Sequence, residues 1–101
     1  MTDESYTVTV AKDLEDLVPG FMRNRNKEVE TLRTALAAGD FEQLRQIGHR
    51  MKGVGNSYGF ARVSTIGKQI EDGARASDAS GIDALISDYA VYLERVVIVY
   101  E

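Results

Sequence analysis

The sequence predicts an all-α domain, an antiparallel up-down four-helix bundle with a short extra helical segment near its N-terminus. Three observations lead to this fold class. Apolar residues recur at helical spacing over four long segments, as in helices that bury one face. Short turn-forming segments separate them, so neighbouring helices should fold back on one another. The 101 residues, 44% of them hydrophobic, suffice for one domain with a single core.

Residues 1–11 are expected to form an N-terminal arm, and residues 12–101 the bundle. Tyr6–Val10 alternates in polarity and is rich in β-branched residues, as a strand would be. No partner strand is evident, and one strand alone makes no sheet. We therefore expect an extended arm lying on the bundle, with a disordered tail as the alternative.

The bundle should begin with a short helical segment over Lys12–Val18. Pro19 and Gly20 follow it inside a continuing helical stripe. Because proline removes a backbone hydrogen bond and bends a helix, we expect a bend or break there. A long helix should then run to about Ala38, where Gly39 is well suited to end it.

The next helix should span Phe41–Ser57. Asp40 and Gln43 have the spacing of a capping box at its start, and Gly59 is placed to end it. A further helical pattern begins near Phe60. So short a link predicts an antiparallel hairpin of these two helices.

The last helix should follow the turn-rich Ser77–Gly81, with Ser80 and Asp83 as its cap. An apolar stripe begins at Ile82 and continues almost to the C-terminus. Val96–Tyr100 favours a strand when taken locally, but the stripe that enters it from Ile82 favours helix.

Composition excludes several classes of function. The net charge is −4, from 12 basic and 16 acidic residues, which argues against a general nucleic-acid binder. The chain has no cysteine, so thiol catalysis, disulfides and cysteine-based zinc sites are excluded. The first residues are acidic and polar, unlike a signal peptide, and no apolar run approaches the ~18 residues of a membrane span. We expect a soluble, cytoplasmic protein with neither nucleic-acid nor membrane partners.

The chain holds a single histidine, His49, in the middle of the predicted Phe41–Ser57 helix. Its helical phase places it on the polar face, opposite the apolar stripe. Arg45 lies one turn before it and Lys52 one turn after. A neutral imidazole has a ring-nitrogen lone pair that can attack phosphorus, and the two cations would stabilise the charge of an added phosphoryl group. Gly53 removes side-chain bulk beside it, which suits close approach by another macromolecule.

The spacing of His49, Lys52, Gly53 and Gly59 resembles the H-x-x-K-G-x-x-x-x-x-G signature of the histidine-containing phosphotransfer (HPt) domain family. The resemblance covers nearly the whole chain, from about Leu14 to Tyr100. It implies that His49 carries a phosphoryl group between receiver-domain aspartates in a two-component phosphorelay. Response-regulator receiver domains and a sensor or hybrid histidine kinase are the implied partners.

Glu71 is a candidate to orient the imidazole. It lies as far after Phe60 as His49 lies before it, so a hairpin brings the two to the same height. A carboxylate that accepts the Nδ1–H holds the tautomer in which Nε2 is free to attack. In HPt-like domains an acidic or amide side chain at this offset has that role, so the resemblance agrees. The alternative is an ordinary solvated glutamate.

Contacts with a partner are also expected around His49. Docking in the resembled family uses a modest apolar patch, for which Val18, Phe21 and Met22 are candidates. The other expected contact positions are Arg45, Gly53, Asn56 and Gly59.

The sequence lacks a phosphate-binding glycine-rich loop and an acidic Mg²⁺ site for ATP. We therefore expect a phosphoryl carrier and not an enzyme with its own ATP site. No cofactor or metal is expected on this chain, and Mg²⁺ only on the partner receiver. Two alternatives stay open: a scaffold or inhibitor bundle that carries no phosphate, and the phosphorylatable domain of a larger histidine kinase.

Overall fold

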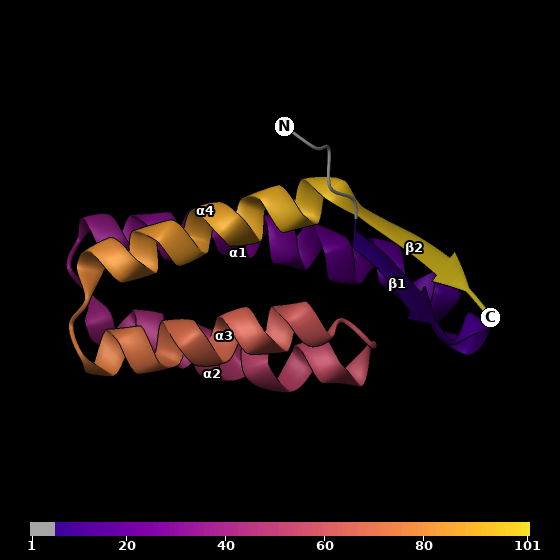
Figure 1. Cartoon of the computed structure of the whole chain (residues 1–101), viewed down its shortest axis with the longest axis horizontal. Helices are drawn as coiled ribbons and strands as arrows, with labels where there is room; N and C mark the ends of the chain where they lie inside the picture. The colour runs from indigo at the N-terminus through magenta and orange to yellow at the C-terminus, as the bar shows by residue number, and fades with distance from the viewer. Residues whose placement is uncertain (1–5) are drawn as a thin grey trace.

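The computed structural model describes residues 6–101 and contains four α-helices, a short 3-10 helix and two short strands (Figure 1). In chain order they are β1 (Tyr6–Val10), η1 (Lys12–Leu17), α1 (Val18–Ala37), α2 (Phe41–Ser57), α3 (Ala61–Arg75), α4 (Ala79–Arg95) and β2 (Val96–Tyr100). The prediction of an all-α bundle is confirmed. Residues 1–5 of the predicted arm lie outside the described residues.

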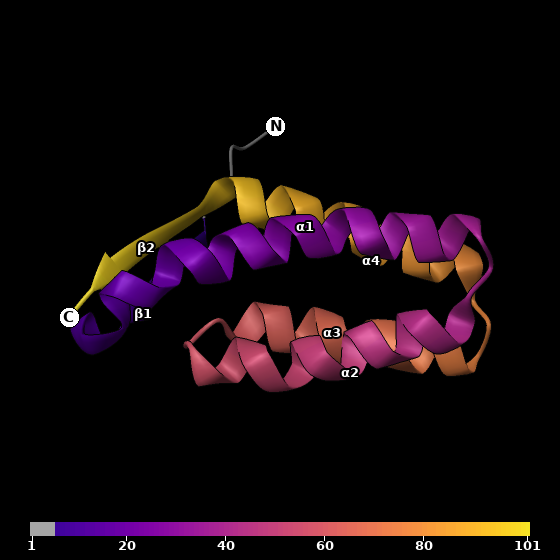
Figure 2. The same cartoon turned by 180° about the vertical axis from the view of Figure 1, so that it is seen from behind.

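The four helices form two pairs. Helices α1 and α4 lie side by side, and α2 and α3 form the other pair (Figures 1 and 2). The chain turns back at every link, so consecutive helices run in opposite directions. Within residues 6–101, none of the helices combines the length and apolar character that a membrane span requires.

Helices α1, α2 and α3 each end in a tight turn closed by backbone hydrogen bonds, whereas α4 runs directly into β2. At the end of α2, Phe60 N donates to Gly55 O at 2.8 Å and Gly59 N donates to Asn56 O at 3.2 Å. Gly59 takes a φ of +86° there, a conformation that glycine adopts without steric cost. Gly39 closes α1 in the same manner, with a φ of +67°. These turns explain the three-residue links.

The helix starts are fixed by acidic caps at two positions. Asp40 accepts a hydrogen bond from Gln43 N, so the predicted start of α2 is confirmed. The predicted cap of α4 is wrong, because Asp78 and not Ser80 accepts from the backbone, at Gly81 N. Ser80 lies inside the first turn of the helix.

The start of α1 differs from the predicted bend. Lys12–Leu17 forms a 3-10 helix, and α1 begins at Val18 with Pro19 in its first turn. Proline is favoured there because the first amide groups of a helix have no intrahelical acceptor. Pro19 therefore lies in the first turn of the long helix, where proline is tolerated.

The C-terminal segment is a strand, and the predicted helix over Val96–Tyr100 is wrong. Strand β2 pairs in parallel with β1, with Tyr6 opposite Val96 and Val10 opposite Tyr100. The local preference of five β-branched and aromatic residues prevails because the other end of the chain supplies the missing partner strand. The predicted extended arm is accordingly half of a two-stranded sheet.

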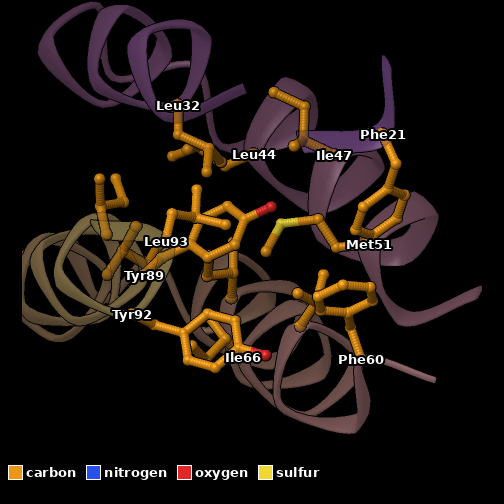
Figure 3. Packing of buried hydrophobic residues seen from close by; sticks show 14 of the residues in the cluster. Phe21, Leu32, Leu44, Ile47, Met51, Phe60, Ile66, Tyr89, Tyr92 and Leu93 are labelled. Carbon is orange, nitrogen blue, oxygen red and sulfur yellow. The ribbon is translucent and has the colours of Figure 1, made fainter. Parts of the chain in front are cut away.

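All four helices contribute to one hydrophobic core. Figure 3 shows side chains of α1, α2 and α4 meeting there, among them Leu32, Met51 and Tyr89. At the end near the sheet the rings of Phe21 and Phe60 stack, with centroids 4.8 Å apart. This core orients α2, so that its opposite face is left to solvent.

Candidate functional site

His49 lies on the outer face of α2. Leu44, Ile47 and Met51 on the other face are completely or almost completely buried. The His49 side chain is 62% exposed. The helical phase of the sequence thus predicted its position, and the imidazole is accessible to another protein.

Glycines let α2 and α3 approach until their backbones touch. A Cβ built on Gly48 would lie 2.6 Å from Gly67 O and 2.7 Å from Glu71 N, both backbone atoms. A Cβ on Gly67 would lie 2.7 Å from Gly48 O. A Cβ on Gly55 would likewise lie 2.7 Å from Ser64 N. The backbone of Glu71 therefore lies directly against the residue that precedes His49.

This close approach brings the Glu71 carboxylate to the imidazole. Glu71 Oε2 lies 3.1 Å from His49 Nδ1. The glutamate side chain is only 3% exposed. The predicted juxtaposition of the two side chains is present, and the alternative of a solvated glutamate does not hold. When Nδ1 carries the ring proton it donates to Glu71, which leaves the lone pair on Nε2, on the part of the ring that faces away from Glu71.

The basic side chains of His49, Lys52 and Arg75 surround this carboxylate. Lys52 Nζ lies 3.2 Å from Oε1, and Arg75 Nη2 lies 3.2 Å from Oε2, the same oxygen that His49 contacts. Burial by itself would raise the pKa of Glu71, but hydrogen bonds from Lys52 and His49, with the positive charge of Arg75, outweigh it and lower the pKa. Glu71 is therefore ionised at neutral pH.

Arg75 is the residue that sequence reasoning missed at this site. Its place one helical turn after Glu71 was the available signal, because residues four apart on a helix lie on the same face. The Arg75 side chain is 60% exposed, so its guanidinium reaches solvent beside the imidazole. The site therefore takes residues from both helices of the hairpin.

Ser64 fastens the two helices at the level of Lys52. Its buried hydroxyl donates to Lys52 O at 2.7 Å and accepts from Asn56 N at 2.9 Å. Those two α2 groups are the carbonyl and amide that pair with each other in a regular α-helix. The serine thereby fixes the backbone of the turn that carries Lys52.

The positive charge flanking His49 is more compensated than the sequence predicts. The Arg45 guanidinium makes two hydrogen bonds to Glu42, of 3.0 and 2.7 Å. This pairing raises the pKa of Arg45 and lowers that of Glu42 to about 2. Since Lys52 is paired with Glu71, both flanking cations have a carboxylate partner.

The predicted partner-contact residues fall into two groups. Gly53 and Asn56 are exposed on the face of α2 that carries His49, and a Cβ on Gly53 would meet no atom within 4 Å. Gly59 is exposed at the turn, where a Cβ would lie 3.3 Å from Thr9 O of strand β1.

Two residues of the predicted apolar docking patch are not available to a partner. Val18 and Phe21 are 2% and 5% exposed. Phe21 packs between Tyr58 and Phe60, so its ring belongs to the core. The patch prediction is wrong for these two, because the stripe that carries them faces inward. Met22 is half-buried.

The family model of the Hpt domain matches residues 16–95. The chain belongs to the Hpt domain family. The match covers most of the chain and includes the whole α2–α3 hairpin with its site, so the recognition made from the signature is confirmed. Comparison with curated proteins and with solved structures finds no match.

The family defines the broad function. This Hpt domain acts in two-component phosphorelay signalling, in which such domains work with receiver domains and histidine kinases. In the described part of the chain, histidine, cysteine and carboxylate side chains nowhere gather in threes as they would around a metal ion. The matched segment ends at Arg95, the last residue of α4, so both strands lie outside it.

Proposed function

We propose that this chain carries a phosphoryl group on Nε2 of His49, between the aspartates of two receiver domains. The observation that supports this most is an exposed imidazole whose Nδ1 lies 3.1 Å from a buried carboxylate, in a member of the Hpt family. A histidine held in this manner presents its remaining nitrogen outward.

The transfer proposed is a displacement at phosphorus. The Nε2 lone pair attacks the phosphorus of a receiver's phospho-aspartate, a P–N bond forms, and the P–O bond to the aspartate breaks. The aspartate leaves as a carboxylate. The ring becomes positively charged as the bond forms, and the negative charge of Glu71 beside Nδ1 stabilises that charge.

Lys52 is proposed to stabilise the phosphoryl group itself. Its side chain is 41% exposed, and its ammonium contacts the same carboxylate as the imidazole. Lysine has a flexible stem and three donors, so the ammonium can turn toward a phosphoryl oxygen. Arg75, which shares Glu71 and is mostly exposed, would add a second positive charge.

The expected partners are response-regulator receiver domains and a sensor or hybrid histidine kinase. The open space at Gly53 and the exposed Asn56 lie on the face that would meet them. Any Mg²⁺ needed in the step would be held by the receiver.

The test is incubation of the chain with a phosphorylated receiver domain, followed by intact-mass analysis at neutral to alkaline pH, where phosphohistidine survives. The wild-type chain should gain one phosphoryl mass, and His49→Gln should gain none. Because His49 is 62% exposed and the glutamine amide can still donate to Glu71, that variant should stay folded.

Other outcomes separate the alternatives. Phosphorylation only by an ATP-loaded kinase domain would indicate a phosphorylatable domain of a larger kinase. No transfer from several receivers or from a kinase would refute the carrier role and favour a scaffold. Unfolding of His49→Gln would contradict the exposed position of the imidazole.

A further inference from the structure

Strand β2 leaves one edge of the small sheet unpaired. Within residues 6–101 the sheet has two strands, and β2 pairs with β1 alone. Figures 1 and 2 show β2 on the outer side of β1, away from the α2–α3 hairpin. Both strands lie outside the segment that matches the Hpt domain model, so the family function does not account for them.

The open edge carries the backbone groups of alternate residues of β2. Glu101, which continues the strand, makes both of its backbone hydrogen bonds on the β1 side. Its amide donates to Val10 O at 3.1 Å, and its carbonyl accepts from Lys12 N at 2.8 Å. Successive residues of a strand direct these groups to opposite edges, so those of Ile98 and Tyr100 point away from β1. They are available to pair with another strand.

The corresponding edge of β1 is covered by the turn between α2 and α3. A Cβ on Gly59 would lie 3.3 Å from Thr9 O, a backbone atom on that edge. Ala61 and Arg62, at the start of α3, line a hollow together with the first four residues of the strand. The edge of β2 is therefore the one that a further strand can reach.

Strand β2 lacks the features that usually keep an edge strand from pairing. Its five residues include no charge and no proline, and its pairing with β1 runs without a bulge. Val97 and Val99 are exposed on its outer face. The side chains of the other three residues, Val96, Ile98 and Tyr100, pack against the core. The strand thus offers an open edge and an apolar outer face.

The sequence around β2 is complementary to a second copy of itself in an antiparallel arrangement. When Ile98 lies opposite Ile98 of the second copy, Val97 lies opposite Val99. Arg95, just before the strand, then lies opposite Glu101, just after it. This register also brings the open-edge backbone groups of the two copies together, because even-numbered residues face even-numbered ones. Two-fold symmetry repeats every contact, so two pairs of opposite charge form.

Arg95 and Glu101 favour a second copy as the occupant of this edge and select the register. Both are exposed, and neither forms an ion pair within residues 6–101. A shift by two residues is the smallest that keeps the open-edge groups paired. Such a shift in either direction would place neither charge opposite its counterpart. The register centred on Ile98 is therefore the one that satisfies the backbone, the valines and the charges together.

We propose that two copies of this chain associate through the outer edges of their β2 strands. The four strands form one sheet in the order β1, β2, β2, β1. The two Ile98 residues exchange two backbone hydrogen bonds, and each Tyr100 amide donates to Val96 O of the other copy. A sheet of more than two strands with an apolar face is more stable than two strands alone. The α2–α3 hairpin lies on the other side of β1, so His49 stays exposed in both copies.

The test is sedimentation equilibrium of the full chain over a concentration series that reaches the millimolar range. Because the interface is small, association should be weak, and the average mass should rise toward that of two chains as concentration increases. Amide hydrogen exchange followed by NMR locates the interface. Exchange at Ile98 and Tyr100 should slow over the same concentration range, whereas Val97 and Val99, which bond to β1, should already be protected in the monomer.

Exchanging the two charges tests the register. Arg95→Glu and Glu101→Arg each place like charges opposite one another, so each should weaken dimerisation at least about fourfold. The double variant restores opposite charges and should return the dissociation constant to within about twofold of wild type. The single variants change the net charge in opposite directions, so an effect of net charge would not weaken both. Arg33→Glu, at an exposed arginine of α1, matches Arg95→Glu in net charge and should leave dimerisation unchanged.

A lysine on the outer face tests the apolar contact. Val99→Lys places a charge against the valines of the second copy and should weaken dimerisation at least about tenfold. Val91→Lys changes an exposed valine of α4 in the same way and should have no effect on dimerisation. Because both valines are exposed, circular dichroism should show both variants folded.

A chain that stays monomeric up to millimolar concentration would overturn the proposal. A dimer in which exchange at Ile98 and Tyr100 does not slow would also overturn it, because its interface would lie elsewhere. Wild-type affinity in both single charge variants, or a double variant no tighter than they are, would contradict the paired charges on which the proposal rests. None of these measurements involves phosphoryl transfer, so they are independent of the carrier role.

Discussion

Replacing Gly48 with alanine tests whether backbone contact between α2 and α3 holds the site together. The new methyl carbon would lie 2.6 Å from Gly67 O and 2.7 Å from Glu71 N. These are backbone atoms of α3, so no side chain can rotate away and the two helices must separate. Gly53→Ala is the matched control, because it is in the same helix and its Cβ would meet nothing within 4 Å.

Both variants remove a glycine from the middle of a helix, but only Gly48→Ala crowds the neighbouring helix. Replacing glycine by alanine inside a helix stabilises it by about 0.5–1 kcal/mol. Gly53→Ala should gain this amount. Gly48→Ala gains it too but pays for overpacking, which typically costs about 1–3 kcal/mol. The difference in unfolding free energy between the variants should therefore be about 1–3 kcal/mol, with Gly53→Ala the more stable.

Urea denaturation followed by circular dichroism measures this difference, and thermal melts check it. A change of 1 kcal/mol shifts the Tm of a domain of this size by about 4–8 °C. Phosphoryl transfer to His49 gives a second test, with wild type as its reference because Gly53 lies on the proposed docking face. Gly48→Ala should displace Glu71 from the imidazole and slow transfer while the chain is still folded. Equal stability of the two alanine variants would refute the glycine contact as the element that sets the helix spacing.

Three further predictions concern the buried carboxylates and the site lysine. Lys52→Ala should slow phosphoryl transfer at least about tenfold without unfolding the chain. Lys68→Ala removes a more exposed lysine, on α3, and should leave the rate unchanged; equal rates in the two variants would remove the role given to Lys52. Because the pKa of Glu71 is lowered in the folded state, its carboxylate stabilises the fold above the usual pKa of 4.5, and this contribution is lost as pH falls through the lowered value. Glu71→Gln should therefore reduce stability at pH 7 and make the urea midpoint fall less steeply below pH 4.5. An unaltered slope of midpoint against pH would contradict this. Tyr89→Phe removes a 2.8 Å hydrogen bond to Glu28 and should cost about 1.5–3 kcal/mol at pH 7, and a loss below 0.5 kcal/mol would show that this bond adds little.

The sequence predicts the parts of the fold that short-range patterns determine. The stripe around Leu44 and Met51 placed α2 and put His49 on its outer face, and Asp40 marked where that helix begins. The offset of Glu71 from the turn sufficed to bring it to the imidazole, because a short antiparallel hairpin fixes which residues share a height. Each of these inferences needs only one helix or one hairpin.

The inferences that failed depend on contacts between distant segments. Val96–Tyr100 has a strand's composition, but only its pairing with Tyr6–Val10 at the other end of the chain makes it one. Phe21 carries no sign in the sequence that Tyr58 and Phe60 enclose its ring. An apolar stripe shows that a helix has a buried side, but not how much of that side stays open to a partner.

The site residues all lie in one hairpin, and this decides how mutations elsewhere act. His49 and Lys52 belong to α2, Glu71 and Arg75 to α3, and glycines join the two helices backbone to backbone. Helices α1 and α4 cover the opposite face of this hairpin and provide core. A core truncation in α1 or α4 therefore lowers the folded fraction but leaves the geometry of the folded site, whereas a small change at the α2–α3 contact alters the geometry directly. Core truncations in α1 or α4 should therefore lower stability without changing the transfer rate of the folded protein, whereas Gly48→Ala should change both.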